Sequence, residues 1–102
     1  MIIVAIDETE LDQLKYIVDS LDNRKCMLKI GSVSFNSIGQ ASIMYASEKG
    51  FDIFLDLKLH DIPNTVKKSI ESLTSLPIKM LTVHTSGGKD MMSAAMEAVS
   101  GT

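Results

Sequence analysis

The sequence predicts an α/β protein built from four strand–helix units around a parallel sheet. Four short apolar runs, at residues 2–6, 27–30, 53–57 and 80–83, recur at nearly even spacing. Each run is too short for a helix and long enough for a buried strand. The segment after each run has apolar residues at helical spacing and signals that start or stop a helix. Strands and helices that alternate in this way form a parallel sheet covered by helices and joined by right-handed crossovers.

The helices are predicted from their apolar faces and end signals. Thr9 is a candidate N-cap of the first helix because Asp12 follows three residues later, and the apolar face comprises Leu11, Leu14, Val18 and Leu21. The second helix would run from residue 37 to residue 49 and stop at Gly50, with an apolar face of Ile38, Ala41, Met44 and Tyr45. The third would be capped by Asn64 and end before Pro77, with an apolar face of Val66, Ile70 and Leu73. The fourth would stop at Gly101, with an apolar face of Met92, Ala95, Met96 and Val99.

Size, charge and cysteine content narrow the class of protein. The 102 residues, of which 45% are hydrophobic and 23% charged, fit one globular domain over residues 1–102. Ten Lys and Arg against 13 Asp and Glu give a net charge of −3, which disfavours nucleic acids and anionic membranes as partners. The longest apolar run, residues 1–6, is too short to span a bilayer and does not have the pattern of a secretory signal. Cys26 is the one cysteine, which suits a reducing compartment, so we expect a cytoplasmic protein.

Two architectures are built from repeated strand–helix units: a doubly wound open sheet and a (β/α)8 barrel. A doubly wound sheet usually has a glycine-rich phosphate turn after its first strand, but Asp7-Glu8-Thr9 stands there and no GxGxxG pattern occurs. A barrel gathers polar side chains at the carboxyl ends of several strands. The residues at the four predicted ends are Asp7, Lys29, Asp56 with Lys58, and His84. We therefore predict four βα units of a TIM barrel, half of the usual eight.

The densest group of chemically active side chains follows the third predicted strand. Asp56 and Lys58 are two residues apart, so they would face the same side of a strand, and Asp61 would lie in the following turn. A lysine between two carboxylates keeps its proton, because nearby opposite charge favours the charged form. Such a lysine is a fixed cation and a proton donor. A purely structural salt bridge at the strand end is the alternative, since buried charges require partners.

Other strand ends add candidate binding groups. Asp7 and Lys29 form a second predicted pair, suited to binding the hydroxyl groups of a polar ligand. His84 precedes a small-residue turn at residues 85–88 whose backbone N–H groups can approach a ligand, although a tight turn alone explains the glycines equally well. His60 and His84 suggest a metal site, but an ion there would lie beside the predicted lysine cation. We therefore predict no metal.

The stretch FLDLKLHDIPNTV, at residues 54–66, closely resembles the signature of the orotidine 5′-phosphate decarboxylase family. Residues 3–7, 28–31 and 82–88 extend the likeness over essentially the whole chain. Sugar-phosphate decarboxylases and aldolases of the same superfamily share the D-x-K-x-x-D spacing and use magnesium. The continuation Ile-Pro-Asn-Thr favours the orotidylate branch.

The resemblance implies a homodimeric barrel that converts orotidine 5′-phosphate to UMP and carbon dioxide in pyrimidine biosynthesis, with no cofactor or metal. Lys58 would stabilise and protonate the carbanion formed at the pyrimidine C6, and Asp56 would stand near the departing carboxylate. Residues matching Asp61 and Thr65 reach the active site of the other subunit in this family. The implied catalytic residues are Asp56, Lys58 and Asp61, and the implied substrate-binding residues are Asp7, Lys29, Ile62 and Thr65.

The chain is short for a barrel, which needs about 200 or more residues. Four units would leave two strand edges and an apolar concave face exposed, so we expect an oligomer that covers them. Two functional hypotheses follow. The first is a decarboxylase, or the N-terminal portion of one. The second is a catalytically inactive half-barrel that oligomerises and at most binds a nucleotide weakly.

Overall fold

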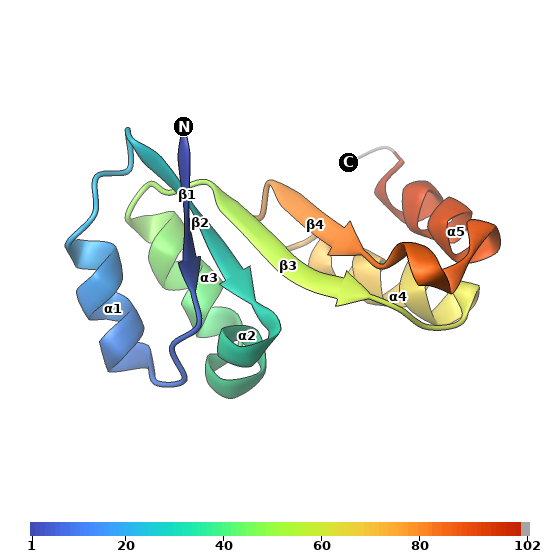
Figure 1. The fold of residues 1–102 in the computed structure, drawn as a ribbon, viewed down its shortest axis with the longest axis horizontal. Helices are drawn as coiled ribbons and strands as arrows, with labels where there is room; N and C mark the ends of the chain where they lie inside the picture. The colour runs from blue at the N-terminus through green and yellow to red at the C-terminus, as the bar shows by residue number, and fades with distance from the viewer. Residues whose placement is uncertain (101–102) are drawn as a thin grey trace. The chain divides into compact units, whose positions relative to one another are not determined.

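The computed structural model describes residues 1–100 and confirms the alternation of strands and helices. Its elements are β1 (Ile2–Ile6), α1 (Leu11–Asp19), β2 (Cys26–Gly31), α2 (Ser32–Ile38), α3 (Gln40–Glu48), β3 (Ile53–Leu59), α4 (Pro63–Leu73), β4 (Met80–Val83), the 3₁₀ turn η1 (Thr85–Gly87) and α5 (Lys89–Val99) (Figure 1). The strands form one sheet in the order β1-β2-β3-β4, so each strand neighbours the next one along the chain. This is the strand order that repeated right-handed crossovers produce in a barrel.

The described chain consists of two compact units. The first comprises Met1–Asp56 and Pro77–Leu81, and the second comprises Leu57–Leu76 and the chain from Thr82 onward. Strands β3 and β4 each contribute to both units. The single domain expected over residues 1–102 stays a prediction.

Strand β2 is the centre of the first unit. Cys26, Met27, Leu28 and Ile30 are all buried, which is the continuous burial expected of a parallel strand covered on both faces. Helix α1 packs beside α3 (Figure 1). The buried side chains of these two helices are Leu14, Val18, Ser42, Ile43 and Ala46.

The pairing register brings the strand ends of the first unit together. In the parallel pair β1–β2, Ile6 lies opposite Ile30, and in the parallel pair β2–β3, Gly31 lies opposite Asp56. Parallel strands all end at the same edge of the sheet. Asp7, one residue beyond β1, therefore follows the strand end that lies next to the end of β2.

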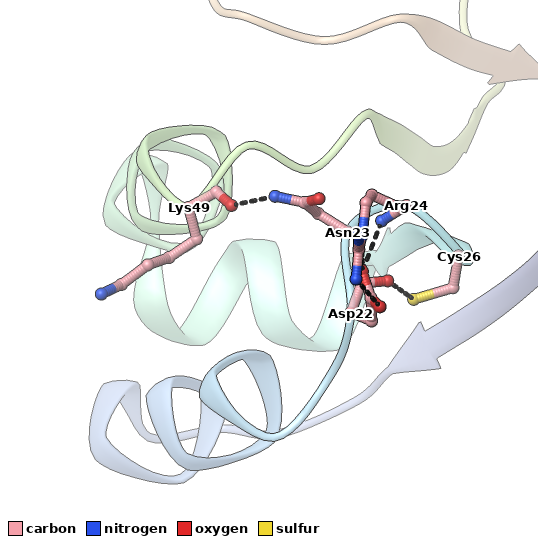
Figure 2. A network of polar contacts seen from close by, with 5 residues as sticks. All are labelled: Asp22, Asn23, Arg24, Cys26 and Lys49. Atoms are coloured by element: carbon pink, nitrogen blue, oxygen red, sulfur yellow. Dashed lines mark hydrogen bonds and ion pairs between the residues drawn. The ribbon is translucent and has the colours of Figure 1, made fainter.

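A polar network fastens the opposite end of β2 (Figure 2). Asn23 Nδ2 donates to the Lys49 carbonyl at 2.9 Å, and the Cys26 thiol donates to the Asp22 carbonyl at 3.5 Å. Hydrogen bonds and charge from the Arg24 guanidinium lower the pKa of the Asp22 carboxyl. Gly50 has a φ of 86°, and a Cβ there would stand 2.6 Å from Asn23 Nδ2, so a side chain at this position would be strained and crowded. The predicted end of the helix at Gly50 agrees with this geometry.

In the second unit, α4 packs against α5 (Figure 1). The predicted apolar face of α4 is confirmed, since Val66, Ile70 and Leu73 are buried. Lys67 Nζ lies 2.7 Å from Glu97 Oε1 and joins the two helices at their surface. This ion pair is exposed to solvent, so packing contributes most of the stabilisation.

The single helix predicted over residues 37–49 is wrong. The chain forms α2 and α3 instead, and they meet at Gly39, which has a φ of 81°. The buried side of α3 also differs from the prediction, because Ser42, Ile43 and Ala46 are buried while Ala41 and Met44 are exposed. Ser42 is tolerated inside because its hydroxyl donates to the Gly39 carbonyl at 2.7 Å.

Two predicted caps are wrong as well. Glu10 rather than Thr9 occupies the N-cap of α1, and its side chain makes no cap bond. Ile62 is the N-cap of α4, which places Asn64 inside the helix, and Pro63 takes the first helical position, where its missing N–H costs nothing.

The predicted face of the last helix is wrong in part. Ala95 is buried as expected, but its buried companions are Met91 and Ala98, while Met96 and Val99 are exposed. The predicted stop at Gly101 lies outside the described residues. Among residues 1–100, none of the helices has the length and apolar character needed to cross a membrane.

Core packing of α1 against α3 gives the first test. Leu14 is fully buried, so Leu14→Ala removes packed methyl groups and should lower the free energy of unfolding by about 2–5 kcal/mol. Tyr16→Ala, on the same helix but 79% exposed, is the matched control and should change it little. Urea unfolding followed by circular dichroism measures both. Equal losses in the two variants would contradict this packing.

Candidate active site

The charged side chains predicted at the strand ends fall into two groups, one in each compact unit. In the first unit, Lys29 Nζ lies 3.6 Å from Asp56 Oδ2 across the β2–β3 pair. The Asp56 side chain is only 9% exposed and that of Lys29 is 34% exposed. A carboxylate so far from solvent requires a nearby cation, and Lys29 supplies it. Lys29, which is predicted to bind a ligand together with Asp7, thus also forms an ion pair with Asp56.

Asp7 lies in the loop after β1, and Ser34 makes hydrogen bonds to the backbone of this loop. The Ser34 side chain is completely buried at the start of α2, and its hydroxyl lies 3.2 Å from the Ile6 carbonyl and 2.5 Å from the Glu8 carbonyl. These carbonyls belong to the residues on either side of Asp7, so the serine fixes the backbone that presents this carboxylate. A Cβ on Gly31 would stand 3.5 Å from Asp7 Oδ1, which places the Asp7 carboxylate next to the end of β2. Sequence reasoning missed Ser34, because this contact spans 28 positions along the chain.

Lys58 has an unusual backbone in the second unit. Its φ is 51°, and among residues 1–100 it is the one non-glycine residue with a positive φ. The left-handed conformation costs an L-residue about 1–2 kcal/mol. Lys58 still lies within β3, and the expectation that Asp56 and Lys58 face the same side of the strand stays a prediction.

Two hydrogen bonds join Lys58 and Leu59 to β4 and to the residue that follows it. The Lys58 N–H donates to Thr82 Oγ1 at 2.9 Å, and the His84 N–H donates to the Leu59 carbonyl at 2.8 Å. The positive φ of Lys58 therefore lies beside contacts with the next segment of the sheet. Strained residues of this kind are found where the surroundings determine the conformation, often at functional sites.

The segment from Asp61 to Thr65 is exposed. The Asp61 carboxylate accepts a hydrogen bond from the Ile62 N–H at 2.7 Å, which turns the chain into α4. The Ile62 side chain is 65% exposed although it is large and apolar. These three predicted site residues, Asp61, Ile62 and Thr65, thus lie on one accessible segment that begins three residues after Lys58 and continues into the first turn of α4.

The two histidines form a stacked pair that sequence reasoning did not anticipate. The rings of His60 and His84 are 5.5 Å apart at their centroids and 17° from parallel. The Ser86 hydroxyl lies 2.6 Å from His84 Nδ1 and 3.5 Å from His60 Nδ1. Both rings are exposed, and within residues 1–100 the structure has no cluster of three or more His, Cys, Asp or Glu side chains arranged to hold a metal ion.

Comparison with protein families gives a match over the whole chain. The model described as "Orotidine 5'-phosphate decarboxylase / HUMPS family" matches residues 1–102. The orotidine 5'-phosphate decarboxylase of Saccharophagus degradans is 45% identical over 100 residues, which are 98% of this chain and 42% of that protein. The one from Salmonella typhimurium is 42% identical over 98 residues, which are 96% of this chain and 40% of that protein. The chain therefore spans about two fifths of the length of these relatives.

Solved structures give the same picture. The crystal structure of orotidine 5'-phosphate decarboxylase from Lactobacillus acidophilus matches with a TM-score of 0.86 and 37% identity, over 96% of this chain and 44% of that one. The enzyme of Methanocaldococcus jannaschii complexed with the inhibitor BMP matches with a TM-score of 0.84 and 22% identity, which shows the shared fold. These matches confirm the predicted half of a TIM barrel.

The buried serine beneath Asp7 gives a stability prediction. Ser34→Ala leaves two carbonyls without their shared donor and should lower the free energy of unfolding by about 1–3 kcal/mol. Ser37→Ala, at an exposed position of the same helix, should have almost no effect. Thermal or urea unfolding of both variants tests this. A Ser34→Ala protein as stable as the Ser37→Ala protein would show that the serine does not fasten the loop.

The left-handed backbone of Lys58 predicts an unusual order of stability. Lys58→Gly should be more stable than Lys58→Ala by about 1 kcal/mol, because glycine adopts a positive φ without strain. Lys68, an exposed lysine within α4, is the matched control, and there glycine should be less stable than alanine by about 1 kcal/mol. Urea unfolding of the glycine and alanine variants at both positions measures these differences. The same order at both positions would argue against a left-handed Lys58.

Proposed function

Because the chain belongs to the orotidine 5'-phosphate decarboxylase / HUMPS family, we propose that it carries the catalytic lysine for decarboxylation of orotidine 5′-phosphate to UMP. The observation that carries this proposal is the signature at residues 54–66, which contains Asp56, Lys58 and Asp61 at the family spacing. It is the sequence match to the family, and not a distance between the two units, that assigns their charged groups to one reaction. Curated relatives that cover the same signature are named as this enzyme.

The reaction requires stabilisation of charge at one carbon atom. The bond between C6 and the carboxyl carbon breaks, carbon dioxide leaves, and the bonding electron pair remains on C6. The Lys58 ammonium stabilises this carbanion by its charge and then donates a proton to C6, which gives UMP. A preorganised cation lowers the energy of such a transition state most effectively when water is excluded. No cofactor enters this scheme, because the ammonium supplies both the charge and the proton.

The other charged residues prepare the site for this step. Asp56 stands near the departing carboxylate of the substrate in the proposed complex. Lys29, its observed partner, supplies a counter-charge to the nearly buried Asp56 carboxylate. Asp7 and Lys29 bind the ribose hydroxyls, since a carboxylate accepts and an ammonium donates hydrogen bonds. Ser34 supports this role indirectly by fixing the backbone on both sides of Asp7.

The exposed turn at Asp61, Ile62 and Thr65 completes the proposal. We assign Asp61 to the charged array and Ile62 and Thr65 to substrate contacts, in the active site of a second subunit. Their accessibility is compatible with this assignment, because a side chain that contacts a second subunit must be exposed in the single chain, as Ile62 is. The proposal therefore includes a homodimer. We also propose that the protein works in the cytoplasm. Sedimentation of the purified chain would measure its oligomeric state.

Turnover by this chain is tested with a lysine pair. The purified protein, produced in a host that lacks its own decarboxylase, should reduce the absorbance of orotidine 5′-phosphate, and Lys58→Ala should reduce kcat by at least about a thousandfold, as expected when a preorganised electrostatic group is removed. Lys68→Ala removes an exposed lysine of α4 and should leave kcat unchanged.

The outcome also separates the two functional hypotheses. Turnover that depends on Lys58 but not on Lys68 supports the decarboxylase. No turnover, together with weak binding of UMP, would support a catalytically inactive half-barrel. Turnover that survives in Lys58→Ala would contradict the role assigned to this lysine.

A further inference from the structure

We propose that Thr82 is a positioning residue for Lys58, because its hydroxyl holds the Lys58 N–H and so maintains the left-handed backbone from which the lysine side chain departs. The role of Lys58 in chemistry rests on the proposed function, whereas the hydrogen bond and the backbone conformation do not. Thr82 does not touch the reacting atoms in this scheme. It acts through Lys58.

The first argument is the local geometry. The distance between the Lys58 nitrogen and Thr82 Oγ1 is 2.9 Å, which is typical of a good N–H···O hydrogen bond. In a regular parallel ladder a strand N–H donates to a backbone carbonyl, but here a side-chain hydroxyl takes that place. The neighbouring contact is an ordinary backbone bond, from the His84 N–H to the Leu59 carbonyl. A side-chain acceptor thus binds the Lys58 N–H, whereas the adjacent Leu59 is bound through its backbone carbonyl.

The second argument is that this side-chain hydrogen bond coincides with the positive φ. A φ of 51° lies far from the values of about −120° to −140° that are typical of strand residues. A lysine has no intrinsic preference for this region, so neighbouring contacts must select it. The amide nitrogen is one end of the N–Cα bond about which φ rotates. A hydrogen bond from the N–H group therefore restrains the orientation of the peptide plane from which φ is measured.

The third argument concerns the choice of residue at position 82. Threonine suits β4 because its branched side chain favours a strand, and its hydroxyl adds an acceptor that valine lacks. Thr82→Val therefore keeps the shape and the strand preference and removes the hydroxyl. Thr82→Ser keeps the acceptor and removes a methyl group. The two variants separate the hydrogen bond from packing.

Nuclear magnetic resonance tests the backbone role on the full chain. In the unmutated protein, Lys58 should show the Cα and Cβ shifts and the HN–Hα coupling of a positive φ, with slow exchange of its amide proton. Thr82→Val should lose the positive-φ signature and exchange the Lys58 amide about fivefold faster or more. Thr82→Ser should keep both properties. Thr74→Val is the matched control, because the Thr74 hydroxyl donates to the Glu71 carbonyl at the C-terminal end of α4.

Kinetics test the consequence for chemistry. With orotidine 5′-phosphate as substrate, Thr82→Val should lower kcat by about tenfold or more, while KM changes by less than about twofold, because a displaced ammonium weakens transition-state stabilisation more than binding. Thr82→Ser should restore kcat to within about threefold of the unmutated chain, and Thr74→Val should not change it. A merely structural role for Thr82 would lower stability without this split between kcat and KM.

The possible results distinguish this proposal from the proposed function. An unmutated chain without a positive φ at Lys58, or a Thr82→Val protein with unchanged Lys58 signals, overturns the positioning role. Loss of those signals in Thr82→Ser also overturns it, because packing of the methyl group would then be responsible. Absence of decarboxylation in the unmutated chain contradicts the proposed function and leaves the resonance measurements to decide the role of Thr82.

Discussion

The register of the parallel pairing across β2 determines where the charged side chains of the first unit stand. Gly31 lies opposite Asp56, and Lys29 is thereby placed to reach the Asp56 carboxylate. A slip of one residue would turn Lys29 toward the side that Leu28 and Ile30 occupy in the core. The same slip would also move Lys29 away from the nearly buried Asp56 carboxylate. Core packing and the ion pair therefore favour the same register, and neither can change alone.

Much of the fold follows from patterns that act over short distances. Continuous apolar runs predict all four strands, since a strand covered on both faces has no polar side. The apolar face of α4 is unambiguous because charged residues surround it. On α5 the pattern is ambiguous, because Met91 and Met92, and later Ala98 and Val99, form two apolar stripes one residue apart. Only the tertiary contact with α4 decides which stripe is buried.

The charged residues of the candidate site can be predicted from the sequence, but the residues that contact them cannot. Charged residues at the end of a buried strand are destabilising unless they are paired or functional, and this reasoning identifies Asp56 and Lys58. The partner of Lys29, the serine beneath Asp7 and the stacked histidines depend on contacts between residues far apart in sequence. The positive φ of Lys58 leaves no trace in the sequence, because the usual left-handed residues are glycine and asparagine.

Approximate energies indicate when electrostatic stabilisation of a carbanion exceeds the backbone strain at Lys58. The left-handed backbone costs about 1–2 kcal/mol. An ammonium 4 Å from a carbanion gains about 1 kcal/mol in bulk water and about 4 kcal/mol at an effective dielectric constant near 20. In open solvent the strain and the gain nearly cancel, whereas in a site that excludes water the gain exceeds the strain. Lys58 is exposed in the described structure, so in the proposed reaction its charge offsets the backbone strain only when a bound substrate or another protein surface displaces the surrounding water.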